Sequence, residues 1–237
     1  MSLERSLSIV VPAYNEAGNI LGTLENVTAA LAPLQIDYEV IVVDDGSTDA
    51  TSTIVRNNAH RFPRVKLLVN ERNMGFGWTY RRGVAAATRD FVVMVHGDNA
   101  WNADTLHDLF ARVGDADIVI GYTRDMWRSR PLARTLLSKA FTLLVNMITR
   151  RRLHYYNGLQ VHRADVLKSL RIQSSGYGFQ AEVLVKALRL TRTYVEVPMQ
   201  LSERTRGESK AFRLKNAVDV VQTLRRLFDI EYGLAKE

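Results

Sequence analysis

A chain of 237 residues, of which 46% are hydrophobic, can bury one large core, and none of its apolar stretches approaches the roughly 20 residues of a membrane span. Because it has no cysteine, the sequence excludes a disulfide framework, a thiolate metal site and a cysteine nucleophile. The formal net charge of +7 favours an anionic partner, but its basic residues are not interleaved with aromatic ones, so nucleic acid is not expected.

Short apolar strands and amphipathic helices alternate over the first 121 residues. Strands are predicted over residues 7–13, 38–43, 65–69, 91–95 and 118–121. Helices are predicted over residues 16–31, 49–60, 75–87 and 102–113, the last of them capped by Asn102. This alternation predicts the α/β class, with a mostly parallel, Rossmann-like central sheet flanked by helices.

The pattern changes after Gly121. Further helices are predicted over residues 132–149, 164–170, 179–190 and 212–228, and further strands over residues 158–161 and 193–197. Pro198 is expected to end the last strand, and residues 202–209 are expected to form a loop that serves as a lid. Because no repeat or low-complexity linker occurs, one domain is expected over residues 1–237. The start lacks the apolar segment of a signal peptide, which favours a cytoplasmic location.

Polar residues follow three of the predicted strands at the point where each strand ends. These segments are Pro12-Ala13-Tyr14-Asn15-Glu16, Asp44-Asp45-Gly46-Ser47-Thr48-Asp49 and His96-Gly97-Asp98. A parallel sheet gathers the carboxyl ends of its strands at one edge, so the three segments predict a site for a nucleotide, a cation or both. Gly46 and Ser47 also fit a simple turn and helix cap, but two adjacent carboxylates repel each other and need an offsetting partner.

The predicted helix over residues 132–149 has apolar side chains on more than one stripe. That pattern is wider than a simple core contact needs, and the helix is too short to span a bilayer. Three arginines, Arg150, Arg151 and Arg152, follow it directly. An apolar helix with a basic flank is typical of a membrane interface with anionic lipid. The alternative is a helix buried between two copies of the chain, as a homo-oligomer.

The motifs carry a resemblance to a known family. Pro-Ala-Tyr-Asn-Glu, Val-Asp-Asp-Gly-Ser-Thr-Asp and residues 70–75, before a strand that ends in an Asp motif, resemble family 2 glycosyltransferases with the GT-A fold. Residues 175–182, 195–198 and 206–210 resemble the polyprenyl-phosphate branch, typified by dolichyl-phosphate mannose synthase. The resemblance implies an inverting transfer from GDP-mannose or a UDP-hexose to dolichyl or undecaprenyl phosphate. It also implies C-terminal helices at the membrane interface and a peripheral location on its cytoplasmic face.

The resemblance further implies a donor half over residues 7–121 and an acceptor half over residues 122–237. In the donor half, the base and ribose of the nucleotide sugar would be held by Pro12, Tyr14, Glu16, Asp44 and Asp45. His96, Gly97 and Asp98 occupy the family's Asp-x-Asp position, which binds a divalent metal, Mn²⁺ or Mg²⁺, on the diphosphate.

In the acceptor half, the resemblance implies that Arg206 and Lys210 lie in a loop that closes on the donor phosphates. The acceptor phosphate would be received by Arg124, Arg134 and Ser138. Arginine suits phosphate because its fork donates two hydrogen bonds, and residues four apart share a helix face. Glu182 is the candidate for contacting sugar hydroxyls, and its alternative is an exposed helix residue.

The chain departs from the family pattern at two places. His96 replaces the first acidic residue of the metal motif, and Ala100 stands where metal-binding relatives often have glutamine. Imidazole favours Mn²⁺ or softer ions over Mg²⁺. An acidic residue that relatives commonly carry shortly before Gly158 is absent from His154-Tyr155-Tyr156-Asn157, which leaves the identity of the sugar open.

Three states of the metal site therefore remain open. A metal can bind through Asp98 and the diphosphate, with or without His96. Arg206 and Lys210 can neutralise the diphosphate, so that metal is weak or dispensable. The protein can also be a catalytically weak nucleotide-sugar-binding protein. A separate alternative is a family 2 transferase for a soluble hydroxyl acceptor, which would need Glu182 or Asp98 as a base.

Overall fold

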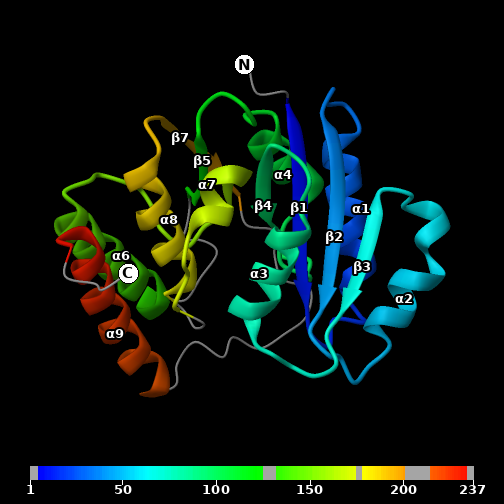
Figure 1. Cartoon of the computed structure of the whole chain (residues 1–237), viewed down its shortest axis with the longest axis horizontal. Coiled ribbons are helices and arrows are strands. Elements are labelled where there is room, and N and C mark those ends of the chain that lie inside the picture. Colours follow the sequence, from blue (N-terminus) through cyan, green and yellow to red (C-terminus); the bar gives the residue numbers. More distant parts are fainter. Residues whose placement is uncertain (1–4, 125–131, 175–177, 201–213, 234–237) are drawn as a thin grey trace.

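Seven strands form one sheet in the order β3-β2-β1-β4-β6-β5-β7 (Figure 1). The strands are β1 (Ser6–Ala13), β2 (Asp37–Asp44), β3 (Val65–Val69), β4 (Phe91–Met94), β5 (Ile118–Thr123), β6 (Gln160–Arg163) and β7 (Tyr194–Met199). This computed structural model describes residues 5–124, 132–174, 178–200 and 214–233, without the side chains of residues 133, 134 and 214–219.

The sheet is mostly parallel, as the sequence predicts. Strand β1 pairs in parallel with β2 and β4, β2 with β3, and β5 with β7. Strand β6 runs antiparallel to both of its neighbours, β4 and β5. A strand from the later part of the chain therefore lies inside the sheet and joins β5 to the strands of the first hundred residues.

Helices flank the sheet on both faces. They are α1 (Ile20–Leu31), α2 (Thr51–Asn57), α3 (Phe76–Ala86), α4 (Ala103–Phe110), α6 (Leu132–Thr149), α7 (Ala164–Ser169), α8 (Phe179–Leu190) and α9 (Leu214–Glu231), with a 3₁₀ turn, η1 (Ala59–Arg61). The predicted cap is confirmed, because the Asn102 side chain accepts a hydrogen bond from the Thr105 amide. The first helix starts later than predicted, since the amides of Asn19 and Ile20 form a turn on the Glu16 carbonyl.

Several predicted strand ends differ from the structure by one or two residues, and two of these differences have a clear physical reason. Strand β6 starts at Gln160 rather than Gly158, where a Cβ would overlap the Gly121 carbonyl oxygen. Strand β7 continues through Pro198 to Met199. Proline lacks an amide donor, but β7 is the last strand of the sheet, so only one of its edges is paired.

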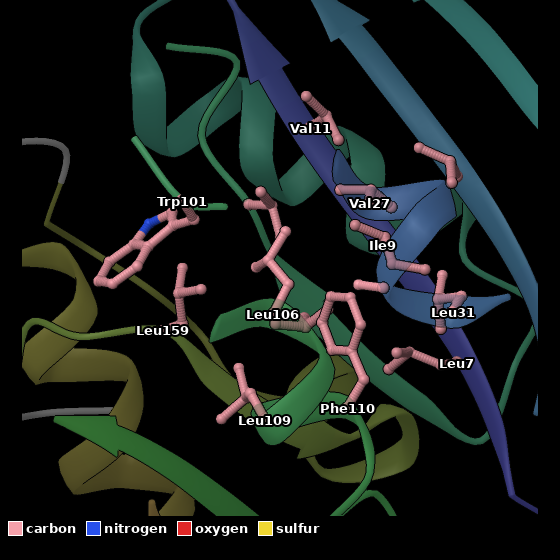
Figure 2. Close-up of a cluster of buried hydrophobic side chains, with 14 of the residues drawn as sticks. Leu7, Ile9, Val11, Val27, Leu31, Trp101, Leu106, Leu109, Phe110 and Leu159 are labelled. Carbon is pink, nitrogen blue, oxygen red and sulfur yellow. The ribbon is translucent and has the colours of Figure 1, made fainter. Parts of the chain in front are cut away.

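Alternating side chains of the central strands pack against helices on opposite faces. Figure 2 shows Leu7, Ile9 and Val11 of β1 in one cluster with side chains from α1 and α4, namely Val27, Leu31, Leu106, Leu109 and Phe110. Val10, between them in sequence, packs in a second cluster with Tyr80 of α3. Burial on both faces explains why β1 is a continuous apolar run rather than an alternating one.

A third cluster lies at the other end of the sheet. Phe141 and Val145 of α6, Leu184 of α8 and Leu227 of α9 pack with Ile120 of β5. Helices α6 and α9 lie side by side there, at the opposite side of the molecule from β3 and α2 (Figure 1). Helices α6 and α9 therefore form one side of the protein, and β3 with α2 forms the opposite side.

One buried group in the sheet makes stability depend on pH. His162 of β6 is fully buried, its Nε2 lies 3.2 Å from Gln160 Oε1, and its Nδ1 has no hydrogen-bond partner among the described residues. Burial lowers the pKa of His162 from 6.5 to about 3. Between these values the unfolded chain is protonated and the folded one is not, so stability falls as pH falls.

Between pH 7 and pH 5, the unmodified protein should lose about 2 kcal/mol of folding stability through His162. We expect the His162→Leu variant to lose about 2 kcal/mol less over the same pH range. Urea unfolding at both pH values measures this difference. The matched control is His107→Leu, because the His107 side chain is partly exposed on α4. An equal loss of stability in both variants would contradict the prediction.

Candidate active site

A cavity of about 300 Å³ opens where β1, β2 and β4 end, next to the start of α3. Its lining comprises Pro12, Ala13, Tyr14, Glu16, Asp45, Asn73, Gly75, Phe76, Thr79, His96, Gly97 and Asp98. The structure therefore brings together the three polar strand ends that the sequence singled out. Asp44 is the one residue of the predicted donor site in this part of the chain that does not line the cavity.

Hydrogen bonds join the segment after β1 to the segment after β2. Asn15, whose backbone has a positive φ of 56°, donates its amide to Ser47 Oγ at 2.9 Å and accepts from the Thr48 amide at 2.8 Å. The amide of Glu16 donates to Thr51 Oγ1 at 2.9 Å. These bonds leave the neighbouring Tyr14 with 45% of its surface exposed at the cavity, so its ring is accessible to a ligand.

The adjacent carboxylates Asp44 and Asp45 are both buried, and each accepts hydrogen bonds from a different set of donors. Asp44 accepts hydrogen bonds from the Ser47 amide at 2.9 Å and from the Ser52 hydroxyl. Asp45 accepts from the amides of Met74 and Gly75 at 2.8 and 2.9 Å. The offsetting partners that the sequence calls for are therefore supplied by the protein, so the repulsion between the two carboxylates does not by itself require a ligand.

Gly46 follows this pair and allows the chain to turn. Its φ of 69° is unfavourable for other residues, and a Cβ would lie 2.7 Å from Arg72 Cα. The loop before α3 thereby approaches β2 closely enough for Asp45 to hold its amides. Asp45 thus orders the loop that lines one side of the cavity.

The segment after β4 carries the metal motif. The Gly97 amide donates to the Pro12 carbonyl at 3.2 Å, and the Gly97 carbonyl accepts from the Thr23 hydroxyl at 3.1 Å. The His96 ring stacks on Phe76, with ring centroids 5.1 Å apart and planes 11° from parallel. His96 and Asp98 are both half-buried at the cavity. Phe76, which fixes the His96 ring, was not predicted from the sequence.

The donor set suits a metal ion only in part. Within the described part of the chain, no cluster of three or more His, Asp or Glu side chains could hold an ion. Asp98 and His96 are two residues apart and line one cavity, so they can supply two ligands. The remaining ligands would be diphosphate oxygens and water, which Mg²⁺ and Mn²⁺ accept. The residues present therefore fit an ion that binds together with a diphosphate.

Known proteins match the chain over most of its length. The model of the family described as "Glycosyl transferase family 2" matches residues 8–171. The undecaprenyl-phosphate mannosyltransferase of Micrococcus luteus is 31% identical over 211 residues, which are 85% of this chain and 85% of that protein. The chain belongs to glycosyl transferase family 2. The resemblance noted in the motifs is thereby confirmed, and the protein is a glycosyltransferase.

Other members and solved structures extend the comparison. A dolichyl-phosphate beta-glucosyltransferase of Trichomonas vaginalis, ALG5C, is 29% identical over 91% of this chain and 69% of that protein. Glucosyl-3-phosphoglycerate synthase of Mycobacterium tuberculosis, solved with Mn²⁺ and UDP, superposes with a TM-score of 0.67 at 21% identity, over 98% of this chain and 82% of that one. TarS of S. aureus, solved with UDP-GlcNAc, superposes with a TM-score of 0.69 at 20% identity, over 98% of this chain and 68% of that one. These structures confirm the GT-A fold.

Glu182 of this family 2 enzyme lies in the interior. It is 0% exposed, so the alternative of an exposed helix residue is wrong. Its oxygens accept from the amides of Gln173 and Ser174, each at 2.9 Å, and from Lys186 at 2.8 Å. Burial raises its pKa, but the hydrogen bonds outweigh burial and the pKa is lowered. Glu182 does not line the cavity, and these contacts give it the role of a structural anchor.

The predicted acceptor residues are only partly described. Arg124 is exposed directly after β5, where its amide donates to the Met199 carbonyl at 3.2 Å. Ser138 is half-buried on α6, and its carbonyl accepts from the Thr142 hydroxyl at 2.9 Å. The Arg134 side chain, Arg206, Lys210 and the predicted lid over residues 202–209 lie outside the described residues.

Proposed function

We propose that this family 2 glycosyltransferase moves one sugar, with inversion, from a nucleoside diphosphate sugar to a polyprenyl phosphate. The observation that carries the proposal is the cavity at the ends of β1, β2 and β4, whose lining includes the accessible Tyr14 ring together with Asp98 and His96. Two similar proteins bear names that refer to undecaprenyl and dolichyl phosphate acceptors. We assign donor binding to residues 7–121 and acceptor binding to residues 122–237.

The cavity suits a nucleotide sugar in size and chemistry. A volume of about 300 Å³ lies at the small end of ligand sites, and residues at the start of α3 form part of the cavity lining. Tyr14 and Glu16 would contact the base and ribose, and the loop that Asp45 orders would enclose them. A divalent cation held by Asp98 and His96, when bound, would neutralise the diphosphate as it leaves. Arg206 and Lys210 would add positive charge to the same group.

The buried position of Glu182 favours a phosphate acceptor over a hydroxyl acceptor. A phosphate monoester is ionised near pH 7 and can attack the sugar without a general base. A hydroxyl acceptor needs a base, and both oxygens of Glu182 are occupied by protein donors. That alternative would therefore depend on Asp98 alone, in the position that the metal motif assigns to the cation.

Helices α6 and α9 expose apolar side chains on the acceptor side of the molecule. Six on α6, two on α9 and one directly after α9 are between 40% and 66% exposed: Leu132, Leu136, Leu137, Leu143, Leu144, Met147, Val221, Phe228 and Tyr232. Arg150, Arg152 and Arg225 are exposed at the same two helices, and α6 contains no acidic residue. An apolar face with basic neighbours matches an anionic membrane surface.

This face, which we name the α6–α9 face, would place the enzyme peripherally on the cytoplasmic side of a membrane that holds the lipid acceptor. None of the described helices has the length and apolar content to cross a bilayer. The alternative occupant is the same face of a second copy. A homodimer built this way would cover the leucines and remove them from lipid.

We expect transfer from GDP-mannose or UDP-glucose to undecaprenyl phosphate in anionic vesicles, with stimulation by Mn²⁺ over EDTA. The affinity of the double variant Leu136→Gln, Leu143→Gln for vesicles should fall at least ten-fold. Burying apolar surface in the membrane contributes about 25 cal/mol per Å², and the two glutamines bury less of it. Vesicle sedimentation and product chromatography measure the two effects.

The matched control is Leu190→Gln, since Leu190 on α8 is 61% exposed but lies off the α6–α9 face. It should leave vesicle binding unchanged. Transfer to soluble hydroxyl acceptors alone would reject the lipid acceptor. A dimer in sedimentation velocity that the double variant dissociates would assign the face to a second copy.

A further inference from the structure

Outside the cavity, an exposed histidine is held in one fixed orientation. The amide of His154 donates to Glu196 Oε1 at 2.8 Å, and His154 Nδ1 lies 2.9 Å from Glu196 Oε2. The His154 ring also stacks on Tyr122, with centroids 4.3 Å apart and planes 15° from parallel. Nevertheless, 60% of the His154 side chain is exposed, whereas only 15% of the Glu196 side chain is.

These contacts exceed what is needed to anchor the loop between α6 and β6. The backbone bond to Glu196 alone fastens the loop to β7. Ordering an exposed side chain costs conformational entropy, and an exposed ion pair contributes less than about 1 kcal/mol in return. The second bond and the stacked ring therefore add little stability, but they fix the direction in which the imidazole points.

The fixed direction also determines which nitrogen is available. A carboxylate can only accept hydrogen bonds, so Nδ1 of His154 carries a proton toward Glu196. Nε2 lies on the opposite side of the ring and is the atom that can meet a ligand. A carboxylate behind an imidazole is a common way of orienting a functional histidine. When the ring is protonated, Nε2 donates a charge-assisted hydrogen bond to an anion.

Topology places this histidine on the acceptor side of the cavity. Strand β5 is antiparallel to β6, which is antiparallel to β4, so β5 ends at the same edge as β1 and β4. Three strand spacings separate β1 from β5, which is roughly 14 Å at ~4.8 Å per strand. Tyr122 lies near the end of β5, and Arg124 is exposed directly after that strand. Because the His154 ring stacks on Tyr122, His154 and Arg124 both lie near the carboxyl end of β5, beyond the cavity.

We infer that His154 contacts the phosphate of the acceptor through Nε2, with Glu196 as the positioning residue behind it. The inference rests on the proposed function, because it takes a phosphate monoester as the acceptor. The phosphate would then meet the His154 imidazole and the Arg124 guanidinium from two sides. His154 stands in the segment where the acidic residue of the family pattern is absent, so no carboxylate of residues 154–157 would repel the phosphate.

Farnesyl phosphate is a suitable probe because it has the phosphate and a short prenyl chain. We expect its Kd, measured by calorimetry on the full chain, to rise roughly 10- to 100-fold in His154→Gln, as for the loss of a charge-assisted hydrogen bond. The Kd of GDP or UDP and the unfolding temperature should stay unchanged. His107→Gln, which alters a histidine on α4, is the matched control and should bind farnesyl phosphate normally.

Glu196→Gln tests the positioning role separately. In nitrogen-15 spectra of labelled histidine, the neutral His154 ring should carry its proton on Nδ1 in the unmodified protein, and this preference should be lost in Glu196→Gln. The Kd of farnesyl phosphate should rise about three- to ten-fold, less than in His154→Gln, since the ring remains present. A purely structural role for Glu196 would lower the unfolding temperature and leave the Kd unchanged.

The outcomes separate this inference from the proposed function. Normal farnesyl phosphate binding by His154→Gln, or absence of binding by the unmodified protein, would overturn the inference. An equal loss of farnesol binding would also overturn it, because farnesol has no phosphate. Binding that depends on His154, without sugar transfer from any donor, would support the inference and reject the proposed transferase reaction.

Discussion

Replacing Asp98 with asparagine is expected to lower sugar transfer by about 100-fold or more and to abolish the effect of Mn²⁺ on nucleotide affinity. Asp98 is half-buried at the cavity and is the anionic member of its metal motif. Loss of its charge would remove the ligand that draws a cation to the diphosphate, and a single missing electrostatic contact to a leaving group costs about 10²- to 10³-fold. Steady-state kinetics and calorimetry of GDP and UDP, each with Mn²⁺ and EDTA, measure the two effects.

Asp104→Asn is the matched control, because Asp104 is an exposed aspartate in the first turn of α4, and its activity should remain unchanged. His96→Asp is expected to shift the preference from Mn²⁺ toward Mg²⁺, since it replaces imidazole with an oxygen ligand. If Asp98→Asn keeps its activity and EDTA has no effect on the unmodified enzyme, the neutralising charge belongs to Arg206 and Lys210.

Replacing Glu182 with alanine is expected to destabilise the fold by about 3 to 5 kcal/mol, the range for removing one partner of a buried charge pair. Its oxygens hold the amides of Gln173 and Ser174 and the ammonium group of Lys186. Arg226 of α9 also lies 3.7 Å from it, so the same carboxylate links α8 to α9. Calorimetry should show a melting temperature lower by roughly 10 °C, at about 2–4 °C per kcal/mol for a chain of this size.

Glu182→Gln keeps the size of the side chain and one acceptor oxygen, so its melting temperature should lie between those of the alanine variant and the unmodified protein. Donor KM should be unchanged for the fraction of either variant that is folded. An unaltered melting temperature together with a raised donor KM would instead restore Glu182 to the sugar-binding role predicted from the sequence.

The sheet and its ligand-binding edge were largely predictable, because continuous apolar runs and polar strand ends are local signals. The segments at Tyr14, Asp45 and Asp98 meet at one cavity as predicted. Sequence spacing could not show that Asp44 and Asp45 find their partners within the chain. Those partners include amides some 30 residues further on, which only the close approach at Gly46 brings within reach.

Other features were missed because tertiary context determined them. Pro198 was expected to end its strand, but an edge position makes its missing amide harmless. Glu182 followed an apolar-polar pattern that also fits an exposed position, and only the fold shows the two backbone amides that it holds. Phe76 gave no signal, since stacking on His96 depends on the approach of α3 to the end of β4.

The position of β6 has a consequence for synthesis on the ribosome. Among the strands that the structure describes, β6 alone connects β5 to β4, and β4 has no neighbour on that side until residues 160–163 pair with it. A nascent chain that stops at residue 121 therefore has an open β4 edge beside the cavity, and its β5 lacks both of the partners, β6 and β7, that the described residues give it. The cavity at the end of β4 therefore acquires its final support only after residues 160–163 have emerged, so the early strands and the later part of the chain complete the sheet together.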